Sequence, residues 1–94
     1  MILIMTNKEA ASIITQAAIR WGQNALDYDV CDDKPLVELY RSDARNLKEV
    51  ARLVRQNKLV EAANKASRLD TIVRDIIPEG PWQHMIRSLN GEQD

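Results

Sequence analysis

Apolar and polar residues alternate along most of the chain with the period of an α-helix. The first periodic segment follows Thr6-Asn7-Lys8-Glu9, a capping-box sequence whose hydroxyl and carboxylate can satisfy free backbone N–H groups. Apolar residues then recur at steps of three or four: Ala10, Ile14, Ala17, Trp21, Ala25 and Tyr28. Small residues form a strip beside them: Ala11, Ala18, Gly22 and Ala25. We therefore predict a helix that ends near Tyr28 and lets a second helix approach closely.

A second periodic segment follows residues 27–34, which are acidic, lack the period and are expected to form a loop. Pro35 suits the first turn of a helix, with Asp33 or Lys34 as its cap. The apolar stripe of this segment consists of Leu36, Tyr40, Ala44, Leu47, Ala51 and Val54. Asn57 can adopt a left-handed conformation. We predict a helix over residues 35–56 that ends in a tight turn at residues 56–58.

The rest of the chain predicts one long and one short helix. A third stripe, over residues 59–77, consists of Leu59, Ala62, Ala66, Leu69, Val73 and Ile76, with Ala63 and Ile77 beside it. Pro78-Glu79-Gly80-Pro81 stops this helix, and Pro81 begins a short one that ends at Asn90-Gly91. Because the turn before Leu59 is short, the second and third helices should pack antiparallel. We expect an all-α fold, an up-down three-helix bundle with a short C-terminal fourth helix.

Length and composition fit one small helical domain. The chain has 94 residues, no Phe and three each of Gly and Pro, too few for the many turns of an all-β fold. We expect a single domain over residues 1–94, with a flexible leader at 1–5 and a frayed tail at 92–94. Either Met1 or Met5 can be the natural start. The five apolar residues of the leader are too short for a signal peptide or membrane span, and Cys31 is alone, so we expect a cytoplasmic protein.

A row of five cations is the most distinctive surface feature. Its members are Arg41, Arg45, Lys48, Arg52 and Arg55, spaced by four, three, four and three residues. At about 100° per residue they point one way, roughly 120° from the apolar stripe, and form a ridge that could meet an acidic protein or phosphates. A solvated face is the simpler interpretation, because Glu38 and Glu49 can pair with Arg41, Arg45 or Arg52. No aromatic residue interrupts the ridge, which favours protein over nucleic acid as the partner.

Four apolar residues of the first two helices point well away from the predicted stripes. They are Ile19 and Leu26 in the first helix and Leu39 and Leu53 in the second. One exposed apolar side chain needs no explanation, but four on two helices form a surface for self-association. We therefore expect a homodimer or a larger homo-oligomer.

Residues with chemical potential do not assemble into a recognisable catalytic site. Asp43 and Asp70 fall in or beside apolar sectors, so we expect ion pairs with Arg20 and Arg74 rather than an acid–base pair. His84 has no ligand at helical spacing, and we expect it to have a surface or packing role. We expect Cys31, without a nearby partner, to be inert.

The acidic stretch does not match a calcium loop. Counted from Asp27, an EF-hand needs Gly at the sixth position and Glu at the twelfth, but the chain has Asp32 and Glu38 there. An acidic loop that faces the cations of a neighbouring subunit is equally consistent. We expect no metal, no cofactor and no enzymatic activity.

The size, the apolar leader before Met5 and the segment Asp70–Pro78 (DTIVRDIIP) are similar to small phage- or prophage-encoded helical proteins. This resemblance implies an accessory factor that docks on a host protein. Together with the ridge, it predicts a non-enzymatic protein-binding module that uses Arg41, Arg45, Lys48, Arg52 and Arg55 and adjacent apolar residues. The alternative is a nucleic-acid-binding protein that uses the same ridge.

Overall fold

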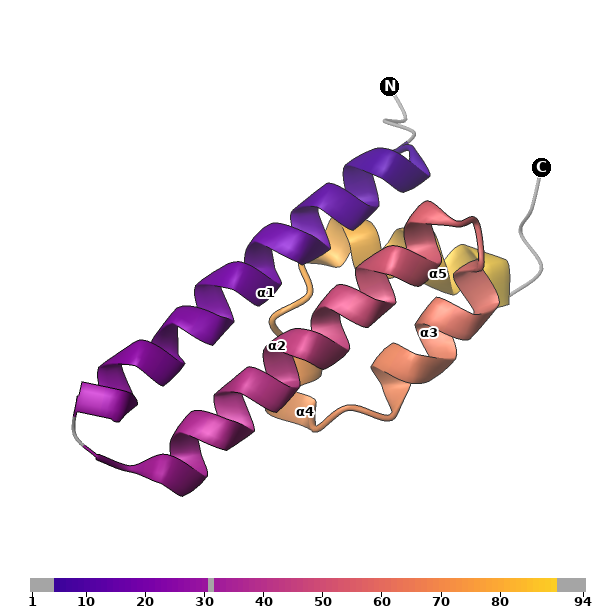
Figure 1. Cartoon of the computed structure of the whole chain (residues 1–94). Coiled ribbons are helices and arrows are strands. Elements are labelled where there is room, and N and C mark those ends of the chain that lie inside the picture. Colours follow the sequence, from indigo (N-terminus) through magenta and orange to yellow (C-terminus); the bar gives the residue numbers. More distant parts are fainter. Residues whose placement is uncertain (1–4, 31, 90–94) are drawn as a thin grey trace.

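The computed structural model describes residues 5–30 and 32–89, with side chains described for 5–26 and 32–87. Its helices are α1 Asn7–Val30, α2 Lys34–Arg55, α3 Leu59–Ser67, α4 Thr71–Arg74 and α5 Glu79–Leu89 (Figure 1). The described residues contain no strand, so the prediction of an all-α fold is confirmed.

The start of α1 follows the predicted capping box in part. The Thr6 hydroxyl accepts the Glu9 N–H at 3.1 Å, which satisfies one free donor of the first turn. The Glu9 carboxylate accepts the Thr6 hydroxyl at 3.0 Å. At its other end α1 continues to Val30, so the helix includes residues 27–30 of the expected loop.

Local signals also set both ends of α2. The Asp33 carboxylate accepts the Leu36 N–H at 3.4 Å, and Pro35 occupies the first turn, as predicted. At the other end Asn57 has φ 62°, and the Lys58 N–H bonds the Leu53 carbonyl at 2.8 Å. This is the left-handed helix ending expected for Asn57.

Helices α1 and α2 form a long antiparallel pair, here called the hairpin (Figure 1). The predicted small-residue strip lies in its interface: Ala11, Ala18 and Ala25 are buried, and a Cβ added to Gly22 would lie 3.3 Å from Ala44 Cβ. Nearer the end of the hairpin where α1 leads into α2, the rings of Trp21 and Tyr40 meet edge to face, with centroids 4.8 Å apart. Small side chains therefore bring the two backbones close together.

The prediction of one helix over residues 59–77 is wrong. Helix α3 ends at Ser67, and the extended backbone of Asp70 (φ −55°, ψ 146°) separates it from the single turn α4. The Ser67 hydroxyl donates to the Ala63 carbonyl at 2.8 Å, and Asp70 occupies the N-cap position of α4. The Asp70 side chain makes no hydrogen bond to the first turn of α4, so side-chain capping does not account for the break.

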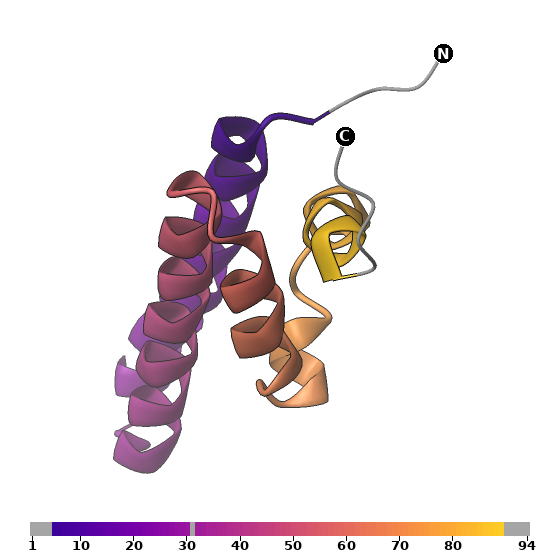
Figure 2. The same cartoon turned by 90° about the vertical axis from the view of Figure 1, so that its right-hand side faces the viewer.

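Helices α3, α4 and α5 lie on one side of the hairpin and form a second layer (Figure 2). Ala62, Ala63 and Ala66 of α3 are fully buried, as is Met85 of α5. Leu53 is only 8% exposed and belongs to the core, so its assignment to the surface is wrong. The reason is that α3 covers a second face of α2 beside the one that faces α1.

The C-terminal helix begins two residues before the predicted Pro81. Pro81 is fully buried in its first turn, where the missing N–H costs no helical hydrogen bond. Of the expected leader, Met5 is partly buried against the core. Residues 1–4 and the expected tail at 92–94 lie outside the described residues.

Candidate functional site

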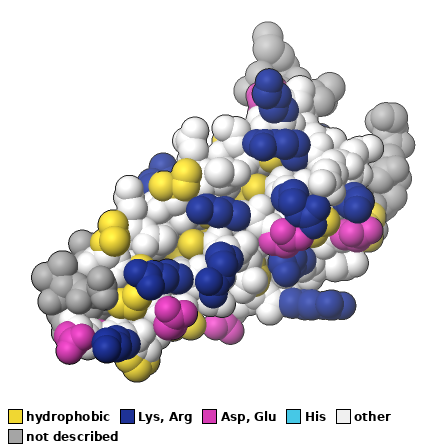
Figure 3. All heavy atoms as spheres, viewed as in Figure 1, with side chains coloured by type: hydrophobic (Ala, Val, Ile, Leu, Met, Phe, Trp, Pro, Cys, Tyr) yellow, Lys and Arg dark blue, Asp and Glu magenta, His cyan; other side chains and the backbone are white. Residues whose placement is uncertain are grey.

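All five cations of the predicted ridge are exposed on α2. The hairpin face that points away from the α3–α5 layer is turned to the viewer in Figures 1 and 3. In Figure 3, which shows this face, Lys and Arg side chains follow α2, and hydrophobic side chains lie among them and along α1. The predicted site residues therefore share one open surface.

Two members of the ridge are bound to carboxylates on their own helix. Arg52 donates from Nε to Glu49 at 2.9 Å and from Nη2 to the other oxygen of the same carboxylate, while Nη1 donates to Gln56 at 3.1 Å. This pairing lowers the pKa of the Glu49 carboxyl and raises the pKa of Arg52. Arg41 lies 3.7 Å from Glu38. The predicted local ion pairs are confirmed for these two cations, whose charge is partly neutralised.

The other three cations are available to a partner. Arg45, Lys48 and Arg55 form no ion pair with any side chain in the described part of the chain. All three side chains are exposed to solvent. The positive charge of the ridge that no carboxylate offsets therefore lies at its centre, on Arg45 and Lys48, and at its C-terminal end, on Arg55.

A groove of about 420 Å³ lies along the hairpin beside this centre. Its floor is made of small residues, Ala18, Gly22 and Ala44, and Gln23 joins its lining. The α1 wall carries Ile19 and Leu26, which are 47% and 61% exposed. The α2 wall carries the three cations Arg41, Arg45 and Lys48.

The sequence analysis joined the ridge to adjacent apolar residues, but it did not assign Ile19 and Leu26 of α1 to the same groove as the cations. The sequence did contain a signal for this groove wall. Ile19 and Leu26 are seven residues apart, so they lie on one face of the helix, beside the small-residue strip that includes Gly22. Leu39, 50% exposed, does not line the groove. The structure therefore combines two of the four stray apolar residues with three of the five cations.

The expected ion pairs of Asp43 and Asp70 are absent. Asp43 accepts the indole N–H of Trp21 at 3.4 Å, while Asp70 is exposed next to the helix break. Neither carboxylate pairs with Arg20 or Arg74, all four residues being within the described range. The break before α4 removes Asp70 from the apolar face it would have had on a continuous helix, so no buried charge there needs neutralising.

His84 joins three elements rather than offering a ligand. Its Nε2 lies 2.6 Å from Asn7 Oδ1, and the Asn7 amide donates to Asn57 Oδ1 at 2.9 Å. Partial burial, reinforced by the nearby Arg87 charge, lowers the pKa of His84. The contact links α5, the start of α1 and the turn after α2, in keeping with the predicted packing role.

The described residues bring no three His, Cys, Asp or Glu side chains together as a metal site. The predictions for Cys31 and for the side chains of Asp27 and Asp29 fall outside the described side chains. Within the described helices, none has the length and apolarity needed to cross a bilayer.

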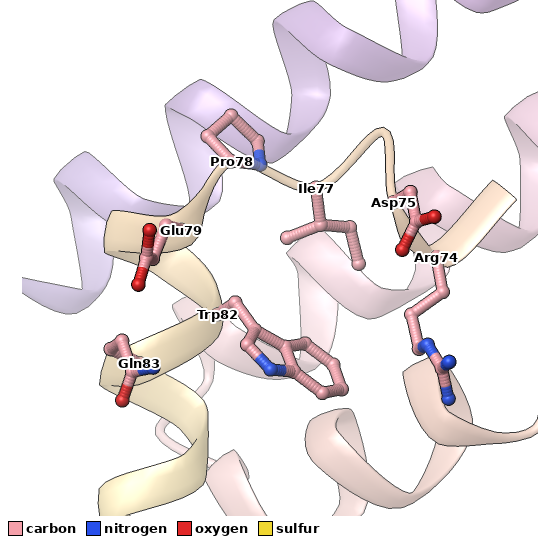
Figure 4. Close-up of a pocket in the computed structure, with 7 residues that line it drawn as sticks. All are labelled: Arg74, Asp75, Ile77, Pro78, Glu79, Trp82 and Gln83. Atoms are coloured by element: carbon pink, nitrogen blue, oxygen red, sulfur yellow. The ribbon is translucent and has the colours of Figure 1, made fainter. Parts of the chain in front are cut away.

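A second hollow, of about 580 Å³, lies between α4 and α5 (Figure 4). Its lining residues are Arg74, Asp75, Ile77, Pro78, Glu79, Trp82 and Gln83. The indole of Trp82 points into the space between the two elements, with Arg74 across from it. Asp75 and Glu79 outnumber Arg74, so the charged side chains of this lining give it no cationic character to match that of the ridge.

No protein-family model matches the chain, and neither curated proteins nor solved structures include one detectably similar to it.

Proposed function

We propose that this chain is a non-enzymatic protein-binding module that docks an acidic partner on its hairpin. The partner would bind the face of the hairpin that points away from the α3–α5 layer, here called the open face. As scaffold we propose an up-down order of α1, α2 and α3, closed by α5. The observation that carries the proposal is the groove between α1 and α2, where exposed Ile19 and Leu26 face unpaired Arg45 and Lys48. Apolar contacts would supply affinity, and the cations would supply association rate and selectivity for negative surfaces.

The cations should contribute unequally. Arg52 already donates to both oxygens of Glu49, so an incoming carboxylate would have to displace an existing pair. Arg45 and Lys48 have no such competitor in the described part of the chain and line the groove. We therefore expect the double change Arg45→Glu/Lys48→Glu to abolish capture of the partner.

A matched control separates this surface from net charge. Arg68→Glu/Arg87→Glu changes the charge by the same amount at exposed positions of the opposite layer. Tagged wild-type protein and both variants are used to capture proteins from an extract, and circular dichroism checks that each variant is folded. The proposal requires a partner retained by the wild type and the control but lost with Arg45→Glu/Lys48→Glu; equal retention by all three would overturn it.

The resemblance to phage-encoded helical proteins supports a more specific version. The chain would then be an accessory factor encoded by a phage, and the partner would be a protein of its host. Expression of the chain in a host cell, followed by capture, tests this version directly. Failure to capture any host protein that depends on Arg45 and Lys48 would contradict it.

Nucleic acid is the alternative partner, favoured by the exposure of the same cations. Its signature is retention on DNA or RNA that falls steeply with added salt. The apolar groove wall favours protein, because phosphates gain nothing from Ile19 and Leu26. Homo-oligomerisation also stays a prediction, and sedimentation of the chain alone tests it.

A further inference from the structure

We infer that the groove binds one amphipathic α-helix of the partner, with acidic residues recurring every three or four positions beside a row of small or aliphatic ones. This inference rests on the proposed function and specifies the conformation and residue pattern of the docking segment. The hairpin groove means the surface lined by Ala18, Ile19, Gly22, Gln23, Leu26, Arg41, Ala44, Arg45 and Lys48.

The two walls of the groove require two different stripes on one ligand. The α1 wall offers the exposed apolar side chains Ile19 and Leu26, and the α2 wall offers only cations. A segment seated between them must therefore present apolar atoms on one flank and carboxylates on the adjacent flank. An amphipathic helix provides these flanks along its whole length.

The spacing of the cations fits a helix better than a strand. Arg41, Arg45 and Lys48 span seven residues of α2, a rise of about 10.5 Å at 1.5 Å per residue. Carboxylates at i, i+4 and i+7 of a second helix lying along α2 have the same rise. Residues on one face of a strand repeat at about 6.7 Å, so three carboxylates would span about 13 Å and lose register with the cations.

The small side chains in the floor of the groove allow the partner to lie close to the hairpin. Gly22 has no side chain, and the other floor residues, Ala18 and Ala44, carry only a methyl group; Ala44 lies across the interface from Gly22. On the opposite face the hairpin is already covered by helices, with Ala62, Ala63 and Ala66 of α3 fully buried. A helix in the groove would cover the open face in the same manner.

The described helices of a second copy of the chain do not provide the required segment. None of the five helices carries acidic residues at three successive positions of one face, and α3 and α5 have one each, Glu61 and Glu79. Glu38 and Glu49 of α2 lie beside the ridge and pair with its arginines. Charge complementarity therefore indicates a different, acidic protein.

The test uses the full ¹⁵N-labelled chain and two synthetic peptides of about 18 residues, roughly 27 Å as helices. Both contain the same Glu, Leu and Ala residues. One places Glu at i, i+4, i+7 and i+11 beside an apolar stripe; the other alternates Glu and apolar residues with period two. We expect only the first peptide to give saturable amide shifts, confined to residues 18–26 and 41–48.

Two groove variants and one control refine the test. Arg45→Glu/Lys48→Glu removes the cations, and Ile19→Gln/Leu26→Gln removes the apolar wall without changing charge. Each variant should bind the first peptide at least about tenfold more weakly than the wild type does, while Arg68→Glu/Arg87→Glu should bind it as tightly as the wild type. The dispersion of each ¹⁵N spectrum shows whether the variant is folded.

The remaining outcomes overturn the inference. Equal binding of both peptides would mean that charge alone is recognised, and tighter binding of a poly-dT oligonucleotide would indicate nucleic acid. Self-association that protects the same amides and excludes the first peptide would make a second copy the occupant. If no peptide binds but capture still depends on Arg45 and Lys48, the helical segment is wrong and the proposed function stands; if capture is also independent of them, both fail.

Discussion

Leu39 and Leu53 provide a direct test of the arrangement of the helices. Both are leucines of α2 outside its predicted apolar stripe, but they are 50% and 8% exposed respectively. Burial of Leu53 depends on α3 lying against a second face of α2. Truncation of each to Ala therefore measures whether that contact exists.

The expected magnitudes differ several-fold. Leu-to-Ala changes in protein cores cost about 2–5 kcal/mol, and we place Leu53→Ala at about 2–3 kcal/mol because the residue is slightly exposed at the edge of the core. Leu39→Ala should cost about 0.5 kcal/mol, as is usual for a surface change. A chain of this length has a total unfolding free energy of about 5–14 kcal/mol, so the loss at Leu53 would be easily measured.

Urea unfolding followed by helical circular dichroism is the appropriate assay. The difference of about 2 kcal/mol between the variants corresponds to a urea midpoint roughly 1–2 M lower for Leu53→Ala, with an unchanged slope. Equal midpoints for the two variants would refute the contact between α2 and α3. There would then be no basis for saying that α3 covers one face of the hairpin and leaves the groove face uncovered.

Three further changes test local features of the fold. Asn57→Ala should cost at least about 1 kcal/mol, because φ 62° is unfavourable for Ala, and Asn57→Gly should cost less; thermal melts that rank them oppositely would contradict this. Thr6→Ala should cost about 1 kcal/mol through loss of the cap on α1, whereas Thr6→Ser should be nearly neutral in the same melts. The pKa of His84 is lowered in the folded chain, so the unfolded chain takes up the proton first, and unfolding free energy should fall as pH drops below about 6.5. His84→Gln should flatten this dependence between pH 7 and pH 5, and an unchanged slope would assign it to other groups.

Features decided by neighbouring residues were predictable from sequence. Thr6, Asp33 and Asn57 mark helix ends because their side chains or backbone conformations act within a few residues. The apolar stripes of α1 and α2 also identified most of the hairpin interface, because these stripes are long and strictly periodic. The cations of α2 were placed on one face by the same argument.

Features decided by the packing of distant segments were not predictable in this way. The helical period continues through Leu69, Val73 and Ile77, so the break at Asp70 was hidden by a pattern that both a straight and a broken helix satisfy. Leu53 was misassigned because a helical wheel shows where a side chain points but not which segment covers it. The hairpin groove needs the relative placement of α1 and α2, which no single stripe contains.

Hydrogen exchange on the captured complex tests the docking surface most directly. Bound and free protein are compared after capture by the wild-type chain. We predict slower exchange in residues 16–26 and 41–48, which carry the groove, and no change in residues 59–87, which include α3, α4 and most of α5. Slower exchange confined to residues 59–87 would contradict the claim that the partner docks on the open face of the hairpin.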